Sequence, residues 1–358
     1  MDQVNQPLSS LQGLRALAAL AVFMFHLVPY VEVAGAGLFP EQVYRWGYAG
    51  VDIFFVLSGF VLTLSAASGR GHQVAIKFYT LRIWRIYSGY WPFLILMYLA
   101  NLFFGFERAA DDSILGSIFL IDIRLEKLVL AVSWTLTYEL YFYALFCLLF
   151  LIPPARSRVA ALVYTGAIVA FTAIYSDSAD SLVLGFIFSP YVLEFFFGVL
   201  LAKYWLRGAI EIPKPLLWFT FMASFYAGSI LFNVAPEDEL GRSITFGIGS
   251  GALILAVASN NLLEGRRLGR GLAGLGNASY TLYLCHLIFI DTAHELGLFA
   301  YLGQQDQALA NLGILTFIVT VCLFSTTFYR LYEKPTYLWL KSRMREQRKI
   351  ILGRDDRT

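Results

Sequence analysis

The chain has 358 residues, of which 58% are hydrophobic and only 15% are charged, and its mean hydropathy is +0.64. A soluble domain cannot bury so much apolar surface, so the composition excludes an ordinary soluble protein and predicts an all-α polytopic protein of the lipid bilayer. The net charge of +2 says little by itself, and we expect no nucleic-acid partner. The three cysteines lie in apolar runs, which argues against a disulfide framework or a metal cluster.

Ten apolar runs of spanning length follow one another, so we expect about ten transmembrane helices. They lie at residues 11–30, 48–67, 86–104, 131–152, 158–174, 185–205, 215–234, 243–259, 279–297 and 308–330. The first run has no basic region and no small-residue cleavage site beside it, so we expect it to be an uncleaved span. We therefore expect a membrane domain over residues 1–340 and a basic cytoplasmic tail over residues 341–358.

The distribution of positive charge predicts the orientation. If the N-terminus is cytoplasmic, 22 of the 27 Lys and Arg residues fall on the cytoplasmic side and 5 on the outer side. Because Lys and Arg accumulate in cytoplasmic loops, we expect both termini in the cytoplasm of a multi-pass protein of the inner (plasma) membrane. The longest outer loop, residues 105–130, is acidic, and the tail is predicted to be a helix near anionic lipid.

The first run carries two ionisable side chains, Arg15 and His26. The two lie eleven residues apart, which in an α-helix is a rotation of about 20° beyond three full turns and a rise of about 16 Å. Both side chains therefore project from one face of the helix. Ionisable groups in a membrane are costly and usually face a cavity or a partner. The alternative is that Arg15 reaches the headgroups and His26 is a packing residue.

The second run contains Asp52 near its outer end and Ser58-Gly59 near the middle. Glycine lets a ligand or another backbone approach closely, and a simple helix-packing notch is the alternative. The helix of the third run is expected to begin just before that run with Arg82 and Arg85, which lie three residues apart and so share a face. A guanidinium group suits phosphate because it donates two parallel hydrogen bonds, although ordinary cytoplasmic charge would also explain the pair.

The fourth run contains Glu139, about 12 Å from the outer end of its helix. By the same rise per residue, His26 lies about 7 Å below the outer face of the membrane. The carboxylate and the imidazole can therefore lie at a similar depth. The ninth run begins with the polar stretch Ser279-Tyr280 and carries His286 seven residues after Ser279. We expect His286 to lie nearer the donor than the acceptor. The tenth run leads to Glu333-Lys334-Pro335, where we expect Pro335 to end the helix.

These stretches together resemble the acyltransferase-3 family of integral membrane acyltransferases, over roughly residues 9–337. The matching pieces are Leu14-Arg15-Ala16-Leu17-Ala18 with His26, Gly50 to Phe60, Arg82/Arg85 before Ile86-Tyr87, Ser133-Trp134 with Glu139 and Phe142-Tyr143, Ser279-Tyr280 with Tyr283-Leu284 and His286, and Glu333-Lys334-Pro335. Two departures are visible. Ser88 stands where the family often has proline, and no hydrolase-like domain follows the last helix.

The resemblance implies transfer of an acyl group, most often acetyl, from cytoplasmic acyl-coenzyme A to a hydroxyl of a cell-surface or lipid-linked carbohydrate. It implies no metal. The catalytic candidates are His26 as general base, Glu139 as the group that orients it, and Asp52 as a second candidate for the orienting group. The resemblance implies that the donor and acceptor are contacted by Arg15, Arg82, Arg85, Ser58, Gly59, Trp134, Tyr143 and His286.

Two other classes of function remain open on the sequence. A secondary transporter of a small anionic or sugar-like solute would also need many helices with buried charges, but it should show inverted repeats and broken helices. A structural or binding protein of the membrane would tolerate the loss of His26, whereas the enzyme would not. Transfer through Ser58 as a nucleophile is less favoured than direct transfer, because no base is placed beside it.

Overall fold

The computed structural model describes residues 7–38, 40, 46–65, 71–105, 113–175, 182–208, 212–235, 237–260 and 267–352. Within these ranges the regular elements are all helical. They are α1 (Pro7–Val33), η2 (Trp46–Ala49), α3 (Gly50–Ser65), α4 (His72–Phe104), α5 (Ile114–Phe119), η4 (Leu125–Lys127), η5 (Ala131–Ser133), α6 (Trp134–Leu151), α7 (Pro154–Tyr175), α8 (Leu182–Ile187), α9 (Tyr191–Leu206), α10 (Lys214–Val234), α11 (Glu239–Asn260), α12 (Arg267–Asn277), α13 (Ser279–Glu295), α14 (Leu298–Leu302), α15 (Gln307–Phe328), η6 (Tyr329–Glu333) and α16 (Lys334–Leu352).

Within the described residues, each of the ten predicted apolar runs is largely helical, although the run at 185–205 is divided between α8 and α9. Among the described residues, nine helical segments are long and apolar enough to cross a membrane. The remaining run forms α13, whose 17 residues lie at the lower limit for crossing a bilayer. The prediction of an all-α polytopic membrane protein is confirmed, with nine clear spans in the described part of the chain rather than ten.

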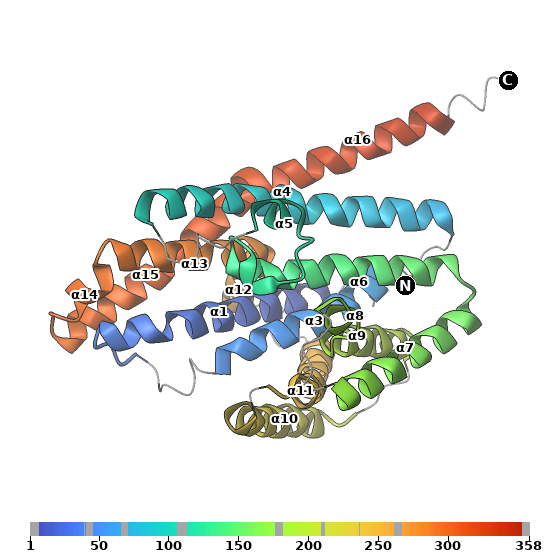
Figure 1. Cartoon of the computed structure of the whole chain (residues 1–358), viewed down its shortest axis with the longest axis horizontal. Helices are drawn as coiled ribbons and strands as arrows, with labels where there is room; N and C mark the ends of the chain where they lie inside the picture. The colour runs from blue at the N-terminus through green and yellow to red at the C-terminus, as the bar shows by residue number, and fades with distance from the viewer. Residues whose placement is uncertain are drawn as a thin grey trace.

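The core lies where α1, α3, α6, α9 and α13 meet, with α4 and α16 along one edge of the bundle and α7 and α10 along the other (Figure 1). Large aromatic side chains fill this core, and five of the largest fully buried ones are Phe23, Tyr90, Phe142, Tyr143 and Phe195. The rings of Phe142 and Phe195 stack with centroids 4.7 Å apart and join α6 to α9. Aromatic packing therefore fixes the helices that surround the site described below.

The helices do not begin at a common level. A Cβ atom on Gly50, the first residue of α3, would lie 2.5 Å from the carbonyl oxygen of Ala18 and 2.9 Å from Val22, so α3 begins against the middle of α1. Depths counted from the ends of separate helices are therefore not comparable. A prediction that two residues share a depth, such as that for His26 and Glu139, therefore needs the contacts between the helices.

A pair of glycines brings α3 and α9 into backbone contact. A Cβ on Gly59 would lie 2.0 Å from the carbonyl oxygen of Phe195, and a Cβ on Gly198 would lie 2.0 Å from that of Val56. Small residues allow such close crossings in membrane helices. The structure thus places Gly59, expected to contact substrate, in a helix-packing notch, which was the alternative that the sequence left open.

The expected helix end at Pro335 is wrong. α15 continues through a π-helical turn, η6, into α16, and Pro335 is the second residue of that last helix. Proline has no N–H to donate, and the π-helical turn directly before it changes the hydrogen-bond pattern at this point of the helix. Figure 1 shows α16 projecting from the bundle beyond α4.

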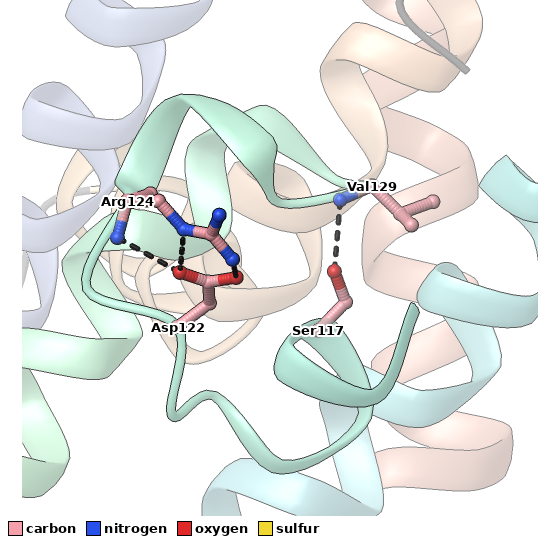
Figure 2. A network of polar contacts seen from close by, with 4 residues as sticks. All are labelled: Ser117, Asp122, Arg124 and Val129. Atoms are coloured by element: carbon pink, nitrogen blue, oxygen red, sulfur yellow. Dashed lines mark hydrogen bonds and ion pairs between the residues drawn. The ribbon is translucent and has the colours of Figure 1, made fainter. Parts of the chain in front are cut away.

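The segment 113–130 folds against α4. The Tyr90 hydroxyl donates to the carbonyl oxygen of Ser117 over 2.9 Å, and the Trp91 Nε1–H donates to that of Ile118 over 3.1 Å. The Ser117 hydroxyl in turn accepts from the backbone N–H of Val129 (Figure 2). Part of the segment expected as an outer loop is therefore a packed structure on the middle of a long helix.

An ion pair closes the same segment. The Arg124 guanidinium donates to Asp122 from Nη2 over 2.8 Å and from Nε over 3.0 Å, and the Arg124 backbone N–H donates to the same carboxylate (Figure 2). These hydrogen bonds hold the pKa of Asp122 well below its usual range. The pair thus closes a short turn at neutral pH.

Candidate active site

A cavity of about 820 Å³ lies between α1, α3, α4, α6 and α13. Its charged lining consists of three arginines and one carboxylate. The lining residues are Arg15, Val51, Phe54, Phe55, Ser58, Val61, Leu62, Arg82, Arg85, Ile86, Thr135, Leu136, Glu139, Tyr143, Ser279, Tyr280 and Tyr283. We call this the arginine cavity; it brings together six of the eleven residues singled out in the sequence.

Arg15 is held in the cavity by polar and aromatic neighbours. Its Nε–H donates to the Ser279 hydroxyl over 3.2 Å, and its guanidinium carbon lies 6.0 Å from the centre of the Phe54 ring. The contact ties the start of α13 to α1. Arg15 thus faces the cavity, as the sequence predicts, instead of extending to the headgroups.

The other two arginines come from one face of α4. The guanidinium carbon of Arg82 lies 5.8 Å from the centre of the Tyr143 ring, close enough for a cation–π contact. The Tyr143 hydroxyl donates to Glu139 Oε1. Glu139 also interacts electrostatically with Arg15 and Arg85. The carboxylate therefore offsets part of the positive charge, and a net positive cavity remains for an anionic group.

His26 lies outside this lining and contacts a second histidine. His286 Nε2 is 3.2 Å from His26 Nδ1. His26 Nδ1 is also 2.9 Å from the carbonyl oxygen of Val22, and His286 Nδ1 is 3.2 Å from that of Leu282. The two imidazole rings lie with their centres 5.0 Å apart.

The partners of the two rings assign their tautomers. A carbonyl oxygen only accepts hydrogen bonds, so Nδ1 of each histidine carries the proton. His286 Nε2 then accepts from His26 Nδ1–H, and the neutral His26 ring carries its basic lone pair on Nε2. This is the arrangement of a general base oriented by a neighbour, with an imidazole where other enzymes place a carboxylate.

Tyr283 connects the histidine pair to the arginine cavity. It lines the cavity, and its ring centre lies 5.8 Å from that of His286. Its hydroxyl donates to the carbonyl oxygen of Val132 over 3.1 Å and accepts from Thr135 over 3.0 Å, which fixes the ring against α6. The histidines therefore lie at the Tyr283 side of the cavity, one helical turn farther along α13.

The placement of two predicted residues differs from expectation. Glu139 accepts a hydrogen bond from Tyr143, and the side chain that contacts His26 Nδ1 is that of His286. The sequence predicts that His286 lies nearer the donor than the acceptor. The difference depends on contacts between α1 and α13, which no single helix reveals.

Asp52 belongs to a separate buried cluster. Its carboxylate accepts from Arg242 Nη2 over 3.0 Å and from Nε over 3.3 Å, and it is fully buried. A second buried carboxyl group, Glu194, interacts with both residues. Asp52 thus forms a buried ion pair that joins α3 to α11.

Ser58 lines the arginine cavity, whereas Trp134 packs beside it. The Trp134 ring lies 5.4 Å from that of Tyr191 and 6.2 Å from that of Phe55. The described residues contain no group of three or more His, Cys, Asp or Glu side chains placed to hold a metal ion. The cations of the cavity suit the phosphates of a nucleotide-bearing substrate.

Sequence reasoning missed Glu194, Arg242 and the role of Tyr283. Glu194 lies inside a predicted span, so an ionisable group in an apolar run was the available signal. Arg242 is one of the five positive charges expected on the outer side, and this charge count gives it no further role. Tyr283 belongs to a matching piece of the family pattern, which gives it no role by itself.

Comparisons with known proteins agree on one family for this chain. The family model described as an acyltransferase domain (Acyl_transf_3) matches residues 8–330. The exopolysaccharide production protein ExoZ of Rhizobium meliloti (strain 1021) is 30% identical over 308 residues, which cover 81% of this chain and 89% of the relative. No solved structure matches significantly.

Two further relatives match nearly the whole chain. The acyltransferase MdmB of Streptomyces mycarofaciens is 26% identical, with 92% of this chain and 91% of the relative covered. The putative peptidoglycan O-acetyltransferase YrhL of Bacillus subtilis (strain 168) is 25% identical over 93% of this chain but only 55% of its own length. With a family match over most of its length and a helical bundle of membrane-spanning segments, the chain belongs to the acyltransferase-3 family and is an integral membrane O-acyltransferase.

Proposed function

We propose that this enzyme transfers an acyl group, acetyl in the simplest case, from acyl-coenzyme A on the cytoplasmic side of the inner membrane to a carbohydrate hydroxyl. The acceptor is a glycan or a lipid-linked sugar outside the cytoplasm. The observation that carries the proposal is a net positive cavity beside an oriented histidine pair on α1 and α13. Membership of an acyltransferase family favours this reading over a transporter.

The donor would lie along the arginine cavity. Its phosphates would contact the guanidinium groups, for which Arg is well suited because its planar fork donates paired hydrogen bonds. The extended pantetheine arm would then lead toward His26, which lies eleven residues beyond Arg15 on α1, a rise of about 16 Å. Ser58 would donate or accept a hydrogen bond along this arm.

The chemical step follows from the tautomer of His26. Its Nε2 lone pair takes the proton of the acceptor hydroxyl as that oxygen attacks the thioester carbonyl. The imidazolium formed keeps its Nδ1–H bonds to His286 Nε2 and to the carbonyl oxygen of Val22. Collapse of the tetrahedral intermediate breaks the C–S bond, and the departing thiolate takes the proton from Nε2. The acyl group passes directly from sulfur to oxygen.

The acceptor class is inferred from two relatives. One is named for exopolysaccharide production and another as a putative peptidoglycan O-acetyltransferase. Both names concern carbohydrate polymers of the cell surface. Because the alignments with these two proteins cover most of this chain, we propose a carbohydrate hydroxyl as the acceptor.

Mass spectrometry of surface glycans tests the proposal. Cells that produce the protein should carry acetyl groups on a glycan, each adding one acetyl mass, and cells that lack it should not. Cells that produce His26→Ala at the same level are the matched control, and their glycans should resemble those of cells that lack the protein. Identical acetylation in all three would overturn the proposal.

A further inference from the structure

A second cavity, of about 710 Å³, lies between the start of α1, α4, the end of α12 and the junction of α15 with α16. We call it the junction cavity. Arg85 lines both this cavity and the arginine cavity, so one guanidinium group borders both spaces.

The lining of the junction cavity offers three kinds of contact. Arg85 and Lys334 supply positive charge, Tyr329 and Tyr337 supply aromatic rings, and Gln12 and Asn277 supply amides. Phosphates bind Lys and Arg, while planar bases stack on aromatic side chains and form hydrogen bonds with amides along their edges. A nucleotide needs all three kinds of contact, whereas a bare anion would use only the cations.

One polar atom in this lining is unsatisfied. Gln12 Oε1 is buried and has no hydrogen-bond partner among the described residues. A buried acceptor without a partner costs about 1–3 kcal/mol, so such an atom is usually satisfied by a ligand or by water. The exocyclic amine of an adenine ring is a donor of the required kind.

The junction itself has an unusual backbone. Tyr329 to Glu333 form a π-helical turn, and such turns are rare and frequent at functional sites. Glu333 accepts a hydrogen bond from the Thr281 hydroxyl over 2.6 Å, which anchors the turn to the start of α13. The two cavities together have four cations, Arg15, Arg82, Arg85 and Lys334, against two carboxylates, Glu139 and Glu333.

We propose that the junction cavity binds the adenosine and the 3′-phosphate of the acyl-coenzyme A donor, while the arginine cavity receives the pyrophosphate, the pantetheine arm and the thioester. Arg85 is then the shared contact at the point where the donor passes from one cavity to the other. The inference rests on the proposed function, and it adds the residues that select a nucleotide-bearing donor: Gln12, Lys334 and Tyr337.

A truncated donor separates the two cavities experimentally. Acetyl-pantetheine carries the same thioester as acetyl-coenzyme A but has no nucleotide. Transfer kinetics would be measured with both donors on the full chain in phosphatidylcholine nanodiscs. We expect Lys334→Gln and Tyr337→Ala to raise KM for acetyl-coenzyme A roughly tenfold or more and to leave KM for acetyl-pantetheine unaltered.

Two controls accompany these variants. Lys341→Gln removes a lysine of the same helix that does not line the cavity, and it should leave both KM values as in the wild type. Adenosine 3′,5′-bisphosphate should inhibit the wild type competitively against acetyl-coenzyme A and should inhibit Lys334→Gln at least tenfold more weakly. Gln12→Ala should weaken this inhibition too.

The results that would overturn the proposal are distinct. Equal losses with both donors would make these residues structural, and unchanged KM values would place the nucleotide elsewhere. Inhibition by added anionic phospholipid, without inhibition by the bisphosphate, would assign the cavity to a lipid headgroup. Failure of the wild type to transfer acetyl from either donor would instead overturn the proposed function, and this inference with it.

Discussion

His286 Nε2 lies 3.2 Å from His26 Nδ1, although 260 residues separate the two in the chain. His286 is fully buried, and its own Nδ1 is directed at the carbonyl oxygen of Leu282. These contacts leave His286 Nε2 as an acceptor for His26. His286 is therefore a positioning residue for the proposed base, the role that the sequence had led us to expect of Glu139.

Replacement of His286 tests this role. His286→Ala should lower kcat about 100-fold, at the lower end of the roughly 10²–10⁴-fold range for general acid–base catalysis, and leave KM for the donor near the wild-type value. His286→Gln should recover part of the rate, because an amide oxygen can accept from Nδ1–H. Steady-state kinetics measure both. A raised KM with unchanged kcat would instead assign His286 to the donor.

The arginines of α4 should determine donor affinity. A charge-assisted hydrogen bond contributes about 1.5–3 kcal/mol, so Arg82→Gln and Arg85→Gln should each weaken acyl-coenzyme A binding roughly 10–100-fold. Arg85→Gln should have the larger effect because Arg85 borders both cavities. Equilibrium binding of labelled donor is the measurement. Lys77→Gln, an exposed lysine on the same helix, is the control, and an equal loss in that variant would contradict a specific role.

The pair of Asp52 and Arg242 should act on folding. Removing one partner of a buried ion pair costs about 3–5 kcal/mol because the other charge stays buried, whereas an apolar pair of similar volume is often tolerated. Asp52→Asn and Arg242→Gln should each lower the thermal unfolding midpoint, and the double variant Asp52→Leu/Arg242→Met should recover most of it.

Activity per folded molecule separates folding from chemistry in these variants. It should be retained in Asp52→Asn, measured as transfer normalised to protein that elutes as a single species. Midpoints should be compared at one scan rate, because unfolding of such proteins is often irreversible. An Asp52→Asn protein as stable as the wild type but inactive would return Asp52 to a chemical role.

The Asp122–Arg124 pair predicts acid sensitivity in the segment 113–130. The pKa of Asp122 is depressed in the folded protein by the Arg124 guanidinium, so its stabilising contribution is complete above the unfolded value of about 3.9 and is lost as pH falls toward the depressed value. Amide exchange at Val129, corrected for intrinsic rates, should be constant from pH 8 to 5 and should accelerate below about pH 4. The acid step should be absent in Asp122→Asn; the same step in that variant would assign it to another group.

Local rules predicted the parts of the site that depend on one helix. Arg82 and Arg85 share a helical face because they lie three residues apart, and both line the arginine cavity. The apolar runs gave the helices because each is long enough to cross a bilayer. Arg15 faces that cavity from the helix that also carries His26.

Contacts between helices could not be read from the sequence. The glycine at position 50 allows α3 to begin against the middle of α1, and this stagger changes which residues meet. Asp52 finds its partner 190 residues away on α11. Pro335 lies inside a continuous helix because a π-helical turn precedes it, and no local signal distinguishes that turn from a helix end.

The central claim is that His26 is the base of an acyl transfer from acyl-coenzyme A. Its most direct test is transfer of labelled acetyl from acetyl-coenzyme A to a glycan acceptor by purified wild type and His26→Ala, with donor affinity measured on the same samples. We predict that His26→Ala binds the donor within about threefold of the wild type, since the ring makes none of the phosphate contacts proposed here, and that it transfers no detectable acetyl. Robust transfer by folded, donor-binding His26→Ala would contradict the account.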